Sequence, residues 1–206
     1  MDAPKTLSSQ SERIARAALL SEPHVEPLAR LVERMRQAKG PGYMIPDFDP
    51  LDGGTSAQVL FLLEAPGPKA VASGFVSRNN PDETAKNFFL LNEEAGINRR
   101  STITWNAVPW YVGSGTKIRP ATHEDVREAD EWLTALLGHL HQLRFTMFVG
   151  QKALHAQRVV HSCRPDTQVM TMAHPSPMFI NRALANRDRV RASLQHLAAR
   201  MAACDA

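Results

Sequence analysis

Cysteine is scarce in this 206-residue sequence, which contains only Cys163 and Cys204. A fold held together by disulfides rests on several bridges, and a cluster bound by four thiolates needs four cysteines. Cys204 also lies close to the C-terminal end, where a bridge would be poorly anchored. A disulfide scaffold and an all-cysteine cluster are therefore both excluded.

Long apolar runs and a strong overall charge are missing as well. No stretch approaches the roughly 18 consecutive apolar residues of a membrane-spanning helix. The first residues lack the basic-then-apolar order of a secretory signal, so we expect a cytoplasmic protein with no membrane contact. The 24 Lys and Arg exceed the 21 Asp and Glu by only three, too little for nucleic-acid binding through global charge.

Positive charge is concentrated in the last third of the chain. Residues 139–206 carry nine Lys or Arg against three Asp or Glu, a net charge of +6, together with six of the eight histidines. Any basic surface must therefore come mainly from this region. The hydrophobic content of 43% and the charged content of 22% are those of an ordinary folded protein.

Short apolar runs alternate with helical patterns along the chain. Each run ends at polar or turn-forming residues, as buried strands do, and the runs lie at 59–63, 102–105, 145–149 and 168–172. Ser9 and Glu12 have capping-box spacing, which predicts a helix near Ser9. Helical spacing predicts further helices from Pro27 to about residue 40, over 81–96, from residue 122, over 150–160 and over 184–201. Residues 40–54 are expected to form a loop without regular structure.

This alternation of strands and helices predicts right-handed crossovers and a mostly parallel sheet covered on both faces. We expect a three-layer α/β/α fold around a central four-stranded sheet. One globular domain accounts for the length. Within it, the helices and loop of residues 1–55 are expected to pack on an α/β core formed by residues 56–206.

Three motifs follow strands of the predicted sheet. Ligands of such sheets bind beyond the carboxyl ends of the strands, so these motifs mark the expected site. They are Leu63-Glu64-Ala65-Pro66-Gly67, Trp105-Asn106-Ala107-Val108-Pro109-Trp110 and His174-Pro175-Ser176-Pro177.

In this order the motifs resemble those of the uracil-DNA glycosylase superfamily. Its members carry a Gly-Glu-Ala-Pro-Gly-like loop after the first strand, an Asn after the second and His-Pro-Ser-Pro after the last. The closest similarity is to the family-four, thermophile-type group, because Glu64-Ala65 stands where the best-known glycosylases have Gln-Asp. That group holds an iron–sulfur cluster on four cysteines, whereas this chain has two, and Leu63 replaces the glycine of the first motif. The resemblance, which covers about residues 57–182, thus implies a glycosylase-like fold in a cluster-free relative with no cofactor and no metal.

The resemblance also implies a role for each motif residue. Glu64 and His174 would be catalytic: His174 donates to the charge that develops on uracil O2, and Glu64 orients water or stabilises the sugar cation. The flipped base would be held by Phe75, which would stack on it, by the Asn106 amide, and by the first motif through Ala65, Pro66 and Gly67. DNA would contact Pro175, Ser176, Pro177, Met178 and Arg182, with Ser176 gripping phosphate and Met178 acting as an apolar wedge.

Each of these residues has a purely structural alternative. Phe75 packs on the core in that alternative, Asn106 ends its strand through an Asx turn, and Glu64 caps the following turn. His174 is then a satisfied structural histidine, and Met178 a buried residue before the last helix.

Three functions are consistent with the sequence. The first is a monomeric DNA repair glycosylase that flips out uracil from single- or double-stranded DNA, hydrolyses its N-glycosidic bond and leaves an abasic site. The second is the same scaffold acting on another deaminated or mismatched base. The third is a module that binds DNA or abasic sites with little turnover.

Overall fold

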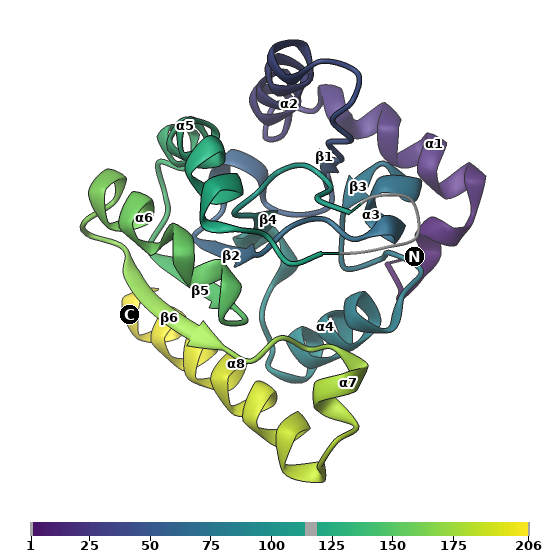
Figure 1. Cartoon of the computed structure of the whole chain (residues 1–206). Coiled ribbons are helices and arrows are strands. Elements are labelled where there is room, and N and C mark those ends of the chain that lie inside the picture. Colours follow the sequence, from purple (N-terminus) through teal and green to yellow (C-terminus); the bar gives the residue numbers. More distant parts are fainter. Residues whose placement is uncertain (1, 114–118, 206) are drawn as a thin grey trace.

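The computed structural model describes residues 2–113 and 119–205 (Figure 1). Four parallel strands form the central sheet in the order β4 (Thr102–Asn106), β2 (Val59–Leu63), β5 (Phe145–Val149) and β6 (Gln168–Met172). All four predicted strands are confirmed, and β4 includes one residue more than predicted, Asn106. Among the described residues no helix has the length and apolar character needed to cross a membrane.

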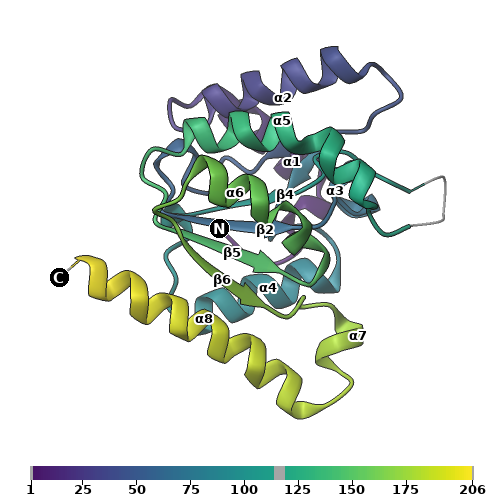
Figure 2. The ribbon, with the colours of Figure 1, turned by 60° about the vertical axis from the view of Figure 1, so that its left-hand side comes forward.

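Helices cover both faces of this sheet, which confirms the predicted three-layer α/β/α fold (Figure 2). One face is covered by α5 (His123–His139) and α6 (Gln157–Cys163), with α2 (Glu26–Lys39) packed on α5. The other face is covered by α4 (Glu83–Glu94) and α8 (Leu184–Asp205). Because side chains alternate along a strand, Leu60 and Leu62 enter the first core and Val59 and Phe61 the second.

Side-chain caps fix the ends of two of these helices. Thr122 and Asp125 form a capping box at the start of α5, in which each side chain accepts from the other residue's backbone N–H. The helix predicted over 81–96 begins at Glu83, because the Asp82 side chain caps it by accepting from the Ala85 N–H at 2.9 Å. The capping box predicted at Ser9 was wrong: Ser9 precedes α1 (Gln10–Ala18), but its hydroxyl bonds to that of Ser11.

The segment before β2 contains regular structure, so the prediction of an irregular loop over 40–54 was wrong there. Asp47–Phe48 forms β1, which pairs in parallel with β3 (Phe75–Val76). The Phe48 ring stacks on Trp105 of β4 with centroids 3.6 Å apart. The local sequence gave no sign of β1, because two residues are too few for strand periodicity and the pairing partner lies 28 positions away.

Two short helices were not predicted. They are α3 (Pro68–Ser73), directly after the first motif, and α7 (Pro177–Ile180), which begins at the last residue of the third. The predicted helix over 150–160 is a 3₁₀ turn at Lys152–Ala156 that continues into α6. Each of these elements is a single turn or little more, too short for an amphipathic stripe to be recognised.

A buried cluster of ion pairs joins the N-terminal region to the sheet. Arg16 of α1 donates to both oxygens of Asp49, at 2.6 and 2.7 Å. Arg99, which begins the 3₁₀ turn Arg99–Ser101 before β4, bridges Asp49 at 2.6 Å and Asp52 at 2.8 Å. Arg78 completes the cluster with its Nε 3.9 Å from Asp52. Three guanidinium groups thus neutralise two carboxylates that are both inaccessible to water.

Burial and charge act in opposite directions on the two carboxylates. Burial alone would raise the pKa of Asp49, but the guanidinium groups of Arg99 and Arg16 hold it below its ordinary value. Burial does raise the pKa of Asp52, because Arg99 and Arg78 offset it only in part and Asp49 lies close by. The cluster therefore depends on the arginines that share these two carboxylates.

We expect Arg99→Met to destabilise the fold by about 3–5 kcal/mol, because it leaves Asp49 and Asp52 short of buried positive charge. Urea unfolding followed by circular dichroism measures this change. Arg191→Met is the matched control, since Arg191 pairs with Asp188 at the surface and such pairs are worth about 0–1 kcal/mol. Equal losses in the two variants would mean that the cluster does not stabilise the fold.

Candidate functional site

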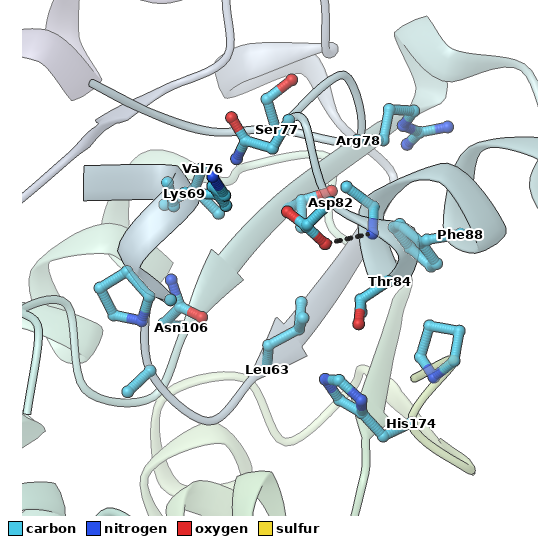
Figure 3. A pocket seen from close by; sticks show the side chains of 18 of the residues that line it. Leu63, Lys69, Val76, Ser77, Arg78, Asp82, Thr84, Phe88, Asn106 and His174 are labelled. Atoms are coloured by element: carbon cyan, nitrogen blue, oxygen red, sulfur yellow. Dashed lines mark hydrogen bonds between the residues drawn. The ribbon is translucent and has the colours of Figure 1, made fainter. Parts of the chain in front are cut away.

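A cavity of about 400 Å³ opens at the carboxyl ends of β2 and β4 (Figure 3). Its walls come from these two strands, the loop after β2 with the start of α3, the segment 76–82, the first turns of α4, and the turn after β6. This is the edge of a parallel sheet where ligands are expected to bind.

The three sequence motifs meet in this cavity, although more than 100 residues separate the first motif from the third. Backbone hydrogen bonds hold the first two together. The Ala107 N–H donates to the Leu63 carbonyl at 2.8 Å, and the Val108 N–H donates to the Glu64 carbonyl at 2.9 Å. The predicted site residues that line the cavity are Ala65, Pro66, Gly67, Asn106, His174 and Pro175.

Asn106 is the last residue of β4 and only 2% of it is exposed. Its side-chain Nδ2 is buried and has no hydrogen-bond partner among the described residues. A buried donor without a partner costs about 1–3 kcal/mol. This amide is therefore set up to donate to a ligand.

His174 lies in the turn after β6, against Gly150 at the end of β5. Gly150 has a φ of +84°, and a Cβ built on it would lie 3.3 Å from the His174 Cβ. Burial lowers the pKa of His174, an effect that the charges of Glu64 and Asp82 oppose. The Asn87 amide donates to the Pro175 carbonyl at 3.1 Å and fixes the turn. His174 is therefore a neutral, positioned imidazole at pH 7.

The structure does not bring the Glu64 side chain into the cavity lining that the described residues form. Its Oε1 accepts from the Ala121 N–H at 2.6 Å, just before α5. Glu64 thus ties the first motif to the segment that enters α5. Its charge still acts on His174 and His155.

The structure likewise keeps Phe75 out of the cavity wall formed by the described residues. Phe75 is 3% exposed in β3, beside β1. The aromatic side chain on the wall belongs to Phe88 of α4, which packs edge to face on Phe61 at 4.9 Å. The Arg78 guanidinium lies 5.5 Å from the centre of the Phe88 ring.

The remaining residues predicted to contact DNA are not part of the cavity lining and lie at the N-cap of α7, on α7 or in the turn that follows it. Ser176 caps α7, its hydroxyl accepting from the Phe179 N–H at 3.3 Å. Pro177 is the first residue of α7, Met178 is 88% exposed, and Arg182 is exposed. Met178 is therefore not the buried residue of the structural alternative.

Several cavity residues were not identified from the sequence. They are Asp82, Thr84 and Phe88 at the start of α4, and Asn80 and Thr104. One signal was available for Thr104, because residues two apart in a strand point to the same side and Thr104 precedes Asn106 by two. Its hydroxyl oxygen is buried without a hydrogen-bond partner among the described residues.

The cysteines do not fit a metal cluster. Cys163 packs on the core between the sheet and α5 and α6, whereas Cys204 packs on the core of the opposite face. The two thiols therefore cannot join one ligand set. Within residues 2–113 and 119–205, no group of three or more His, Cys, Asp or Glu side chains is arranged to hold a metal ion.

Solved structures that match the chain include proteins from Pedobacter heparinus, Methanosarcina acetivorans and mimivirus. The structure of Pedobacter heparinus SMUG2 matches with a TM-score of 0.54 at 10% identity, over 90% of this chain and 86% of that one. A candidate uracil DNA glycosylase from Methanosarcina acetivorans matches with a TM-score of 0.48 at 14% identity, over 69% and 92%. A mimivirus uracil-DNA glycosylase matches with a TM-score of 0.42 at 16% identity, over 87% and 78%. Because the identity is only 10%, the SMUG2 match supports the fold and nothing further.

Sequence comparison adds the family. No curated protein matches the chain significantly. The family model of the uracil DNA glycosylase superfamily, however, matches residues 50–198, which include all three motifs and every strand of the central sheet. The chain therefore belongs to the uracil DNA glycosylase superfamily.

Proposed function

We propose that this protein is a DNA repair glycosylase that flips uracil out of DNA, hydrolyses its N-glycosidic bond and leaves an abasic site. The observation that carries the proposal is the buried Asn106 amide, which has no partner among the described residues and lines a cavity at the ligand edge of the sheet. We further propose a cytoplasmic monomer that is a cluster-free relative of the family-four group.

Recognition of uracil rests on hydrogen-bond complementarity. The Asn106 amide offers a donor for O4 and an acceptor for N3–H, and cytosine presents the opposite pattern at these positions. A site built to bond a polar edge rejects a base that leaves its buried groups unpaired. Ala65, Pro66 and Gly67 supply a close backbone wall beside the base.

His174 is proposed to lower the barrier to bond cleavage. When the bond breaks, negative charge develops on the base, and His174 is proposed to donate a hydrogen bond to uracil O2, where part of that charge lies. A neutral imidazole N–H serves as the donor without a net charge being buried. The turn that carries His174 is held by Pro175 and by the Asn87 contact, so the donor is oriented before the reaction.

DNA is proposed to dock on α7 and the beginning of α8. Pro175, Ser176 and Pro177 form the turn at the cavity mouth, and Met178 projects into solvent as an apolar wedge for the gap in the base stack. Arg182 extends the contact toward phosphates. The positive excess of residues 139–206 lies in this part of the chain.

One observation favours a second candidate, excision of a deaminated purine. The cavity of about 400 Å³ holds a second buried polar atom without a partner among the described residues, the Thr104 hydroxyl, one strand repeat below Asn106. A purine such as hypoxanthine or xanthine reaches further into the cavity than uracil and has polar atoms on its second ring. Thr104 would bond those atoms.

Strand scission after alkali tests the proposed function. Oligonucleotides carrying uracil, hypoxanthine or xanthine, single- or double-stranded, are incubated with the protein and then cleaved at abasic sites. We expect scission at uracil, and a loss of about 10- to 100-fold in kcat/KM for Asn106→Ala, since one or two hydrogen bonds to the base disappear. Retention of DNA without scission at any of the three bases would instead indicate a binding module.

We expect His174→Ala to reduce the single-turnover rate by about 100- to 1,000-fold, because the donor to the base oxygen is lost. DNA affinity, measured by fluorescence anisotropy, should stay within about threefold because His174 does not face phosphates in this proposal. His196→Ala is the matched control, since His196 is exposed on α8 away from the cavity. Unchanged turnover in His174→Ala would remove this residue from the mechanism.

The protonation state of His174 gives a pH prediction. Burial lowers its pKa from the ordinary value, so the imidazole is already neutral at pH 7 and stays neutral as pH rises. We expect a single-turnover rate that is constant from about pH 7 to 8.5. A reaction that needed the imidazolium would slow by about tenfold per pH unit over this range.

A further inference from the structure

Hydrolysis of the glycosidic bond needs a group that positions water, and the first motif lacks one at the cavity. Ala65 has no polar side chain, and Glu64 is directed toward the segment before α5, where its Oε1 accepts from the Ala121 N–H at 2.6 Å. Glu64 is also absent from the cavity lining that the described residues form. If the protein is a glycosylase as proposed, another side chain must position the attacking water.

Asp82 is the one residue with a carboxylate among the described residues that line the cavity. Figure 3 shows its carboxyl group at the cavity wall, with Asn106, Thr84 and His174 around the same open space. Its negative charge also acts on His174, so the two groups are within electrostatic reach of each other. Asp82 therefore faces the reacting region from the side of α4.

The position of this carboxylate is fixed by the fold. Oδ1 accepts from the Ala85 N–H at 2.9 Å, which makes Asp82 the N-cap of α4. A carboxylate is stabilised at a helix N-terminus, where unpaired N–H groups and the helix dipole offer positive potential. One oxygen anchors the side chain, and Oδ2 accepts no hydrogen bond within the part of the chain that the structure describes, so it can accept from a water molecule.

Other polar residues on the same wall are already engaged. The Asn80 side chain donates to the Phe75 carbonyl at 2.9 Å and accepts from Ser73 at 2.6 Å. The Ser77 hydroxyl donates to Asp49. Thr84 has a hydroxyl but no charge, so it is a poor acceptor for the proton of an attacking water.

We propose that Asp82 is the catalytic carboxylate that holds the attacking water. The bond between the sugar C1′ and the base nitrogen breaks, and its electron pair leaves with the base, whose anion is stabilised by His174. The water oxygen adds to C1′, and one water proton passes to Asp82 Oδ2. That proton then leaves to solvent or to the departing base, so the sugar gains a hydroxyl and the base gains a hydrogen.

Asp82→Asn is the decisive variant because an Asn side chain still accepts from the Ala85 N–H and caps the helix. We expect its single-turnover rate of uracil release to fall by about 100-fold or more, within the range for loss of a general base. Its melting temperature and its affinity for DNA should stay close to those of the unaltered protein. Glu83→Gln is the matched control: Glu83 is the next residue, loses the same charge and pairs with Lys5 at the surface. Its rate should stay within about twofold.

The outcomes separate this inference from the proposed function. If the unaltered protein releases uracil and Asp82→Asn does so equally fast, Asp82 is overturned as the water-holding residue while the glycosylase function stands. A large loss in Glu64→Gln with none in Asp82→Asn would return the role to the first motif. If the unaltered protein releases no base from any oligonucleotide, the proposed function and the role of Asp82 both fail.

Discussion

The rest of the structure depends on the buried ion pairs around Asp49 and Asp52. Arg16 comes from the first helix, Arg78 from the segment that forms one cavity wall, and Arg99 from the turn before β4. The Thr104 N–H also donates to Asp52 at 3.2 Å, which connects the cluster to the strand that carries Asn106. A change in any of these charges therefore affects the cavity wall and the strand that carries Asn106 together.

The site itself combines rigid presentation with unsatisfied polar groups. Asn106 is the last residue of β4, where it pairs with Leu63 of β2, and His174 lies in the turn after β6, where Gly150 leaves room for the imidazole. Neither the Asn106 Nδ2 nor the Thr104 hydroxyl has a hydrogen-bond partner among the described residues. In a site of this kind, the free-energy cost of removing the polar groups from water is incurred when the protein folds. Hydrogen bonds to a bound ligand then offset that cost.

Most of the fold could be predicted from the sequence because it depends on local patterns, and half of the residues predicted for the site line the cavity. Apolar runs marked all four strands, and the motifs at their ends identified Asn106 and His174. The direction of a side chain depends on partners far along the chain, so the sequence did not show that Glu64 bonds to Ala121 or that Phe75 packs in β3 beside β1. The sequence did not predict Asp82 as a site residue, because an acidic residue before a helix is ordinarily a cap. Only the folded chain brings it near His174.

Buried and exposed charges in this protein respond differently to salt. At physiological ionic strength the screening length is about 8 Å, and mobile ions reach only groups that contact water. Arg182 and Arg189 are exposed, whereas Asp49 and Asp52 are buried. If DNA binds through the exposed arginines as proposed, salt would weaken that binding and leave the buried ion pairs of Asp49 and Asp52 intact.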